Sequence, residues 1–491
     1  MRHTSHCTRL CAERYLHLSV PVAIISTMTR LNHGLEHFMK KLLTAGFPLF
    51  VCILTVAYSA GTFAQSGGWM AGVAATDITP DEPVWMAGYA SRVHAAEGVL
   101  LPLQAKALAL QDQQGNRGLI LTADVVGVSR ETSDQIFSAL QKALGLERKE
   151  MVFSSSHSHS GPVVGNSLRC IYPYDDEEAR KLDRYTEAFI DKIINLGKQA
   201  FENIRPAILY SGNGIARFAV NRRNNQEGAL SSFTALEGPQ DHAVPVLKVS
   251  GEDGQLYAVL FGYACHATVL DGYLWSGDYP GFAQKALEDR YPGTTALFFA
   301  GCGADMNPLP RRQIPLVQQY GETLAAAVAA QLEGEMKRLD PVLKTGYSET
   351  TLDMLPPPEK EELEKQVATT SGYEQRCSLQ LLESLEKNGS LPVSYPYPLQ
   401  AWKLGGQGFA MLSGEPVVEY AIALKESLGQ DLFVMGYAND YVSYIPSERI
   451  REEGGYEGCK SQIIFGLPNC WAPGLEEKIL SGMRSLVESL H

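Results

Sequence analysis

The chain has 491 residues and a formal net charge of −13 at pH 7. This acidic balance argues against nucleic acid or an anionic membrane surface as a docking partner, because both repel negative charge. Six cysteines follow residue 64, and they show no Cys-x-x-Cys spacing, which argues against a zinc site built from thiolates.

The first 64 residues have the pattern of an export leader. A basic stretch around Lys40 precedes a mainly apolar run that ends in small residues at Ala64. This order is typical of a secretory signal peptide, so we predict a signal at 39–64 and an exported protein, periplasmic or secreted. An uncleaved anchor is the alternative, because a signal and a short membrane span overlap in length. Residues 1–38 are predicted to be an extension upstream of the true start, which leaves a mature domain at 65–491 with no stable membrane span.

From residue 65 onward, short apolar runs alternate with longer helical patterns. The predicted strands are 105–110, 119–126, 151–155, 207–210, 244–249, 257–264, 295–300, 408–412 and 432–436. The predicted helices are 131–144, 176–202, 281–290, 315–339, 359–386, 417–428 and 476–490. This order favours an α/β (mixed α+β) fold, with mixed β-sheets flanked by helices in a single large domain. The stretch 344–398 is predicted to be an insertion or a hairpin of helices on the surface.

The cysteines of the mature domain differ in their surroundings. Cys265 and Cys302 lie in or beside apolar runs and are predicted to be small core residues. Cys459 and Cys470 are close enough in the chain to bridge a local loop, and the sequence leaves both the bridged and the free form open.

Two histidines lie close together in a chain that has few. His157 and His159 stand in MVFSSSHSHSGP, which begins as a strand-like run. Residues i and i+2 of an extended segment point to the same face, so we expect the two imidazoles to converge. Imidazole is a common zinc ligand, and the pair therefore predicts a metal site. A polar loop with incidental histidines is the alternative.

Two further residues are candidates because of their positions. His266 closes the apolar run in YAVLFGYACHATVL, and α/β proteins gather their sites at the carboxyl ends of strands. Glu415 lies at a predicted strand-to-helix junction, with Pro416 in the expected first helical turn. A carboxylate there suits the helix dipole, and it could equally be an anionic metal ligand. Aromatic packing is the default interpretation of three nearby tyrosines, Tyr437, Tyr441 and Tyr444.

Five segments of the chain together resemble the neutral/alkaline, non-lysosomal ceramidase family, in its catalytic N-terminal domain. In order, they are GVAATDITPDEPVWMAGYASR, SSSHSHSGPVVG, FGYACHATVL, LSGEPVVEY and GYANDYVSYIPSERIREEGGYEG. They are similar to the family's first strand with its Met-x-Gly-Tyr turn, its histidine signature, the strand bearing the third histidine, the segment of the metal-binding glutamate and the tyrosine-rich segment. They span nearly all of the mature chain.

The resemblance implies a role for each candidate residue. It implies a zinc ion held by four ligands, namely His157, His266, Glu415 and Tyr444. It places His159, Arg222 and Tyr456 where the family binds and polarises the scissile carbonyl, and His159 could also give a proton to the leaving amine. Zinc with nitrogen and oxygen ligands can activate a water molecule near neutral pH.

The chain departs from the family at two points. Asn307, in AGCGADMNPLP, aligns with the serine of the family's Asp-x-Ser-Pro-Asn segment. An asparagine is not an activated nucleophile, although its amide can hold a water or a carbonyl oxygen, so a metal-activated water is favoured. The chain also ends at His491, soon after the last motif, so we expect a short form without the family's immunoglobulin-like C-terminal domain.

The function implied is zinc-dependent hydrolysis of an amide bond in a small-molecule or lipid-like N-acyl substrate, ceramide or a related compound. Two alternatives stay open. The same site could cleave an ester or a phosphoester, or the chain could be a secreted zinc-binding protein that turns nothing over.

Overall fold

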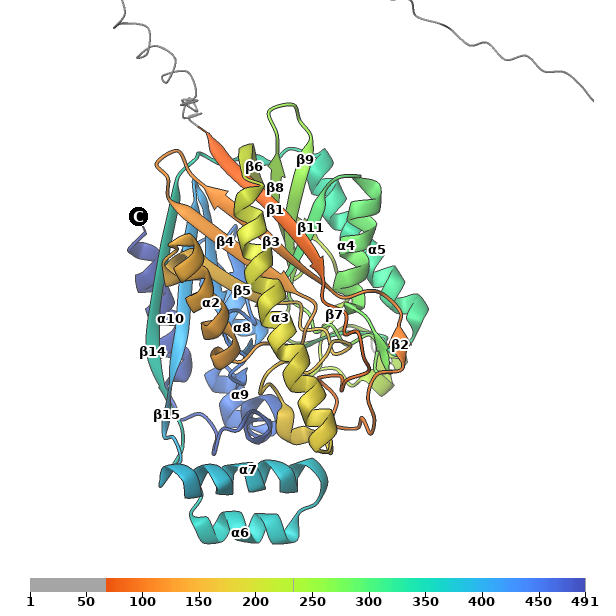
Figure 1. Cartoon of the computed structure of the whole chain (residues 1–491), viewed down its shortest axis with the longest axis vertical. Coiled ribbons are helices and arrows are strands. Elements are labelled where there is room, and N and C mark those ends of the chain that lie inside the picture. The colour runs from red at the N-terminus through yellow and green to blue at the C-terminus, as the bar shows by residue number, and fades with distance from the viewer. Residues whose placement is uncertain (1–67, 233, 491) are drawn as a thin grey trace, which may run out of the picture. The chain divides into compact units, whose positions relative to one another are not determined.

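A nine-stranded mixed sheet forms the middle of the computed structural model, which describes residues 68–232 and 234–490 (Figure 1). The predicted signal peptide and upstream extension lie outside the described residues. Along the sheet the strand order is β11-β9-β8-β6-β1-β3-β4-β5, and β13 pairs with β6. The strands are β1 (Trp69–Asp77), β3 (Gln104–Gln111), β4 (Arg117–Ala123), β5 (Met151–Ser155), β6 (Arg205–Ile215), β8 (Ala243–Ser250), β9 (Leu256–Tyr263), β11 (Thr295–Ala300) and β13 (Lys337–Arg338).

A second sheet of four strands packs on one face of the first. Its order is β14-β15-β16-β18, with the bounds Leu343–Asp353, Ser394–Leu404, Gln407–Leu412 and Phe433–Met435. Apolar side chains from both sheets, including Leu108 and Ile120 on one and Trp402 and Phe409 on the other, form a single buried cluster. Most strands of the large sheet are therefore covered on both faces, which explains why they are continuous apolar runs in the sequence.

Helices cover the two outer faces. One apolar cluster joins the large sheet to α2 (Arg130–Leu144), α3 (Asp176–Glu202), α4 (Asp278–Arg290) and α5 (Ile314–Glu333). Another joins the four-stranded sheet to α8 (Val418–Leu428), α9 (Glu448–Glu453) and α10 (Leu475–Glu488). The layers are helix, sheet, sheet and helix, which confirms the predicted α/β fold.

Two helices, α6 (Lys360–Thr369) and α7 (Gly372–Asn388), lie side by side apart from the sheets (Figure 1). A single helix was predicted at 359–386; that is wrong, because the chain turns at Gly372, whose φ of 65° is left-handed. The hairpin of helices predicted within 344–398 is confirmed as α6 and α7, whereas the two ends of that stretch form most of β14 and the start of β15. β14 is largely polar and half exposed, so it lacks the apolar run that reveals a buried strand.

The other predicted elements are confirmed, with differences at their ends. Each of the nine predicted strands overlaps an observed one, and 151–155 and 295–300 coincide with β5 and β11. The helix predicted at 315–339 ends earlier, at Glu333, because Gly334 adopts an extended conformation before β13.

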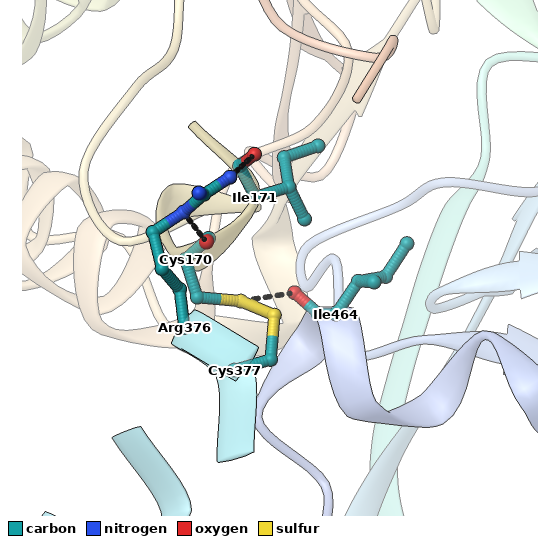
Figure 2. Close-up of a disulfide and its surroundings, with 5 residues drawn as sticks. All are labelled: Cys170, Ile171, Arg376, Cys377 and Ile464. Carbon is teal, nitrogen blue, oxygen red and sulfur yellow. Dashed lines mark hydrogen bonds between the residues drawn. A yellow bond between two sulfur atoms is a disulfide. The ribbon is translucent and has the colours of Figure 1, made fainter. Parts of the chain in front are cut away.

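Two disulfides join parts of the fold. Cys459 is bonded to Cys470, one of the two forms that the sequence left open, and Cys170 is bonded to Cys377 across 207 residues (Figure 2). Cys265 and Cys302 are free and buried, as predicted. Within residues 68–232 and 234–490, no helix is both long and apolar enough to cross a membrane.

Candidate metal centre

Three candidate residues lie just beyond the carboxyl ends of strands, and a fourth, Tyr444, begins a short strand. His157 follows β5, His266 follows β9, Glu415 follows β16 and Tyr444 follows β18. Glu415 and Tyr444 are paired directly, because β17 (Glu415–Pro416) lies parallel to β19 (Tyr444–Ile445). Pro416 is therefore in a short strand before the first residue of α8, not in the first helical turn as predicted.

The histidine pair converges, but not through the alternation of a strand. β5 ends at Ser155, and His157 has a φ of 60°, so the extended geometry assumed for 157–159 is wrong. A left-handed conformation at a non-glycine residue is uncommon and costs free energy, and such strain gathers at functional sites. The Nε2 atoms of His157 and His159 are nevertheless 3.1 Å apart.

The hydrogen bonds of two histidines indicate their tautomers. Nδ1 of His157 lies 2.7 Å from the carbonyl oxygen of Val126, and Nδ1 of His266 lies 2.7 Å from that of Gly303. A carbonyl only accepts, so each Nδ1 carries the proton and each Nε2 presents a lone pair. A backbone carbonyl that fixes the tautomer in this way is typical of histidines that ligate metal ions.

Glu415 faces both of these lone pairs. Its Oε2 lies 3.3 Å from Nε2 of His157 and 3.3 Å from Nε2 of His266, while its Oε1 accepts a hydrogen bond of 2.8 Å from the hydroxyl of Tyr441. The Oε2 atom is buried and has no hydrogen-bond donor among the described residues. Three electron-rich atoms thus face one another inside the protein, an arrangement that a cation would stabilise.

The protonation states suit this arrangement. Burial, and then the charge of Arg222, lowers the pKa of His266 to about 4, and burial also lowers the pKa of His159 well below its ordinary value. Burial alone would raise the pKa of Glu415, but the two imidazoles that face it lower that pKa well below its usual range. At neutral pH His159 and His266 are therefore neutral and Glu415 is a carboxylate, the forms that bind metal ions. His157, His159 and His266 form a buried triad that could hold one.

His159 differs from the other two histidines. Its Nδ1 is buried and has no hydrogen-bond partner in the described part of the chain. Its ring packs against Tyr89, and Gly88, with a φ of 100°, lies so close that a Cβ there would collide with the imidazole. The Gly88-Tyr89 turn therefore seats His159, and this imidazole lacks the backbone hydrogen bond that orients His157 and His266.

Arg222 lies beside the centre and also lines a neighbouring cavity. It donates hydrogen bonds of 3.2 Å to the hydroxyl of Tyr444 and 2.8 Å to Oε1 of Glu457, and one of 3.5 Å to Oδ1 of Asn307. The Tyr444 hydroxyl in turn lies 3.2 Å from Nε2 of His266. Asn307, in β12 (Met306–Pro308), is positioned by pairing with β7 (Ala219–Asn221). The guanidinium is thus held beside the centre by a carboxylate, a phenol and an amide.

Tyr456 lies at the outer edge of the site. It begins η4 (Tyr456–Lys460), is 48% exposed, and its ring centroid is 5.2 Å from that of Tyr444. The structure therefore brings all eight predicted site residues into one region. Their individual roles stay predictions.

The sequence interpretation missed two supporting residues. Tyr441 was interpreted as packing, yet its hydroxyl orients Glu415. Glu457 was not singled out, although it pairs with both Arg222 and Arg223 at 2.8 and 2.7 Å and is almost fully buried. A carboxylate directly after a candidate tyrosine was the only signal for it.

The fold and this site define an α/β protein with a buried candidate metal centre of imidazole and carboxylate groups. Residues 69–337 match the family model described as "Neutral/alkaline non-lysosomal ceramidase, N-terminal". The chain belongs to this family, as its motifs predicted. The matched range includes His157, His159, Arg222, His266 and Asn307, whereas Glu415, Tyr444 and Tyr456 lie beyond it.

Relatives and solved structures agree with this placement. Neutral ceramidase 1 of Arabidopsis thaliana is 26% identical over 303 residues, which cover 59% of this chain and 38% of the relative. Neutral ceramidase A of Dictyostelium discoideum is 23% identical over 280 residues, which cover 53% and 38%. The chain thus spans well under half the length of these relatives. The crystal structure of neutral ceramidase from Pseudomonas aeruginosa has the same fold, with a TM-score of 0.66 at 18% identity over 86% of this chain and 74% of that one.

Proposed function

We propose that this chain is a zinc-dependent amidohydrolase that cleaves the amide bond of an N-acyl substrate, ceramide-like or related. The observation that carries the proposal is the convergence of two Nε2 lone pairs and an unpartnered Oε2 of Glu415 in a buried site. Membership of the ceramidase family supports the choice of an amide over an ester or a phosphoester.

In this proposal the zinc ion is held by His157, His266, Glu415 and Tyr444. When bound, zinc supplies a Lewis acid and lowers the pKa of a coordinated water towards ~7. Nitrogen and oxygen ligands of this kind suit zinc among the available cations.

The other residues act on the substrate. Arg222, held by Glu457 on one side and Tyr444 on the other, is placed to donate to the carbonyl oxygen as negative charge develops there. His159 is neutral and its Nδ1 is unpartnered, so it is free to bind the substrate, or to take a proton from the attacking water and pass that proton to the leaving amine. Asn307 holds Arg222 and offers an amide to the substrate, and it does not act as a nucleophile.

We also propose that the protein is exported through the signal at 39–64. The two disulfides support this, because structural disulfides persist in oxidising compartments. Fractionation of cells that express the full chain tests it, and protein that stays in the cytoplasm with residues 39–64 uncleaved would contradict it.

The function is tested with purified protein, a chelator and a substrate panel. Metal analysis should find about one zinc per chain, and stripped protein should regain hydrolysis of N-acyl amides when zinc is added. His157→Ala should abolish both properties, whereas His242→Ala, which removes a half-buried histidine outside the centre, should keep them.

Other outcomes would redirect the proposal. Cleavage of esters or phosphoesters in preference to amides would replace the amide assignment with a different bond. If the protein binds zinc but hydrolyses no substrate class, the chain is a zinc-binding protein and not an enzyme of these classes. Activity that survives His157→Ala would refute the site itself.

A further inference from the structure

Two hollows adjoin the candidate metal centre, and Tyr456 lines both. The first has a volume of about 540 Å³ and is bounded by Arg222 and Asn307 of the centre, together with Arg223 and Arg311. The second has a volume of about 510 Å³ and lies between the loop of Gly88 and Ala90, helix α7 and η5 (Gln462–Phe465). Both volumes fall within the range of ordinary ligand sites, roughly 300–1,000 Å³.

The first hollow, here called the polar pocket, is unsuited to an alkyl chain. Of the residues that line it, only Leu309 is aliphatic. Its arginines are matched by carboxylates, since Arg222 and Arg223 share Glu457 and Arg311 pairs with Glu227 at 2.9 Å. Each guanidinium has five N–H donors, so donors remain for a ligand after these pairs form. An alkyl chain here would displace the water from those donors and replace no hydrogen bond.

The second hollow, here called the apolar groove, has a mostly apolar wall, although its lining also includes Gln366, Thr370, Glu374, Ser378 and Lys460. Ile171 from η2 (Arg169–Ile171), Tyr373 from α7, and Ile463 and Ile464 from η5 face it. Burying a methylene group on such a surface is favourable, because it removes apolar area from water. The groove therefore favours a hydrocarbon chain over a polar group.

Three of the elements that line the apolar groove, η2, α7 and η5, meet at one disulfide (Figure 2). Cys170 of η2 is bonded to Cys377 of α7, and the Cys170 sulfur lies 3.5 Å from the carbonyl oxygen of Ile464 in η5. Arg376 adds hydrogen bonds of 3.1 and 2.6 Å from α7 to the carbonyl oxygens of Cys170 and Ile171. These links hold the walls in register, so the groove is a pre-formed feature of the fold.

Tyr456 marks the junction of the two hollows. Its ring lies 5.2 Å from that of Tyr444, and the Arg222 guanidinium lies 5.9 Å from its centroid. The two hollows therefore share an edge at Tyr456, beside Tyr444 and Arg222 of the candidate centre.

We propose that the substrate is an amide with a single long alkyl chain, which lies in the apolar groove, and a compact polar group on the other side of the amide, which lies in the polar pocket. An N-acyl derivative of a small polar amine has this form, and so does a short-acyl amide of a long-chain amine. A ceramide with two long chains does not, because its second chain would enter the polar pocket. This inference rests on the proposed amidase function.

The experiment compares four amides in detergent micelles of the same composition. Three carry one long chain: N-dodecanoylglycine, N-dodecanoylethanolamine and N-acetylsphingosine. The fourth, N-dodecanoylsphingosine, carries two. We expect kcat/KM to be at least 10-fold higher for the best single-chain amide, and the identity of that amide shows which side of the bond bears the chain. Equal or faster cleavage of N-dodecanoylsphingosine would overturn the inference and leave the amidase proposal standing.

Variants test the groove itself. Ala90→Trp places a large ring at the exposed rim of the groove and should raise KM for the preferred amide about 10-fold with little change in kcat. Ala188→Trp makes the same exchange at an exposed position of α3 outside the groove and should change neither constant. Equal kinetics for wild type and Ala90→Trp would contradict the placement of the chain.

A binding measurement keeps the groove testable without turnover. Dodecanoate, the fatty-acid product, should displace a fluorescent fatty acid from wild type, and Ala90→Trp should weaken both ligands. If no amide is hydrolysed but this pattern is found, the amidase proposal fails and the groove assignment holds. If neither ligand binds, the groove assignment fails.

Discussion

The metal centre and the apolar groove beside it are built in different ways. His157, His266 and Glu415 are at most 1% exposed. The two histidines donate hydrogen bonds to backbone carbonyl oxygens, and Glu415 accepts one from the hydroxyl of Tyr441. The groove is lined by half-buried side chains of α7 and η5, and one disulfide and one arginine hold its walls together. Short loops at the ends of strands thus position the candidate metal centre, whereas helix α7 and η5 supply a surface that we propose contacts the substrate.

The largest expected effect breaks the metal centre alone. Glu415→Gln keeps the shape of the side chain but removes the charge that faces two imidazoles, so we expect zinc affinity to fall by more than ~100-fold, beyond the loss typical of residues that only support a ligand. Isothermal titration with zinc measures it. Glu288→Gln is the matched control, because this carboxylate pairs with Lys106 rather than with histidines. Unchanged affinity in Glu415→Gln would remove Glu415 from the ligand set.

The next variant removes the disulfide that joins two walls of the groove and leaves the residues of the metal centre unchanged. The double variant Cys170→Ser with Cys377→Ser frees α7 from η2, and we expect the free energy of unfolding to fall by roughly 2–4 kcal/mol. Urea denaturation measures this loss, and zinc content should stay at the wild-type level. Loss of zinc in this variant would show that the two regions are not independent.

The degree of burial also explains which parts of the fold could be predicted from the sequence. Strands buried on both faces, such as β9 and β11, are apolar runs and were found, as was the histidine pair in a chain with few histidines. β14 was missed because one of its faces is polar. The pairing of Cys170 with Cys377 spans 207 residues and leaves no local pattern.

Tyr441 and Glu457 were missed for a related reason. Their roles consist of contacts with residues 26 and 235 positions away, and a tyrosine or a glutamate in isolation is ordinary. The convergence of His157 with His159 was predicted through a strand, whereas a left-handed residue in a loop produces it.

A third prediction concerns Asp278, in the segment after His266, and the way in which it makes the free energy of unfolding depend on pH. Asp278, fully buried, accepts hydrogen bonds from the backbone of Val269 and Leu270, and burial raises its pKa to about 6. An acid whose pKa is higher in the folded state than in the unfolded state loses stability as pH rises through the interval between them, here from about 4 to about 6. This group should therefore make wild type about 2 kcal/mol less stable at about pH 7 than at about pH 4.

Asp278→Asn does not titrate, so it isolates this effect. The difference in unfolding free energy between wild type and Asp278→Asn, measured with urea at both pH values, should shift by about 2 kcal/mol in favour of the variant at the higher pH. A difference that is independent of pH would show that Asp278 titrates alike in the folded and unfolded states.

The variant with the smallest expected effect tests whether a supporting hydrogen bond orients Glu415. Tyr441→Phe removes the hydroxyl that donates to Oε1 of Glu415 and leaves the ring in place. Loss of a partner that orients a ligand typically costs roughly 10–100-fold in metal affinity, and we expect a value in that range from zinc titration. Tyr437→Phe is a close control, because the Tyr437 ring stacks on His157 while its buried hydroxyl has no partner in the described part of the chain. If Tyr441→Phe leaves zinc affinity unchanged, ring packing rather than the hydrogen bond to Glu415 orients the ligand; if Tyr441→Phe weakens zinc and Tyr437→Phe does not, the carboxylate is positioned by that hydroxyl.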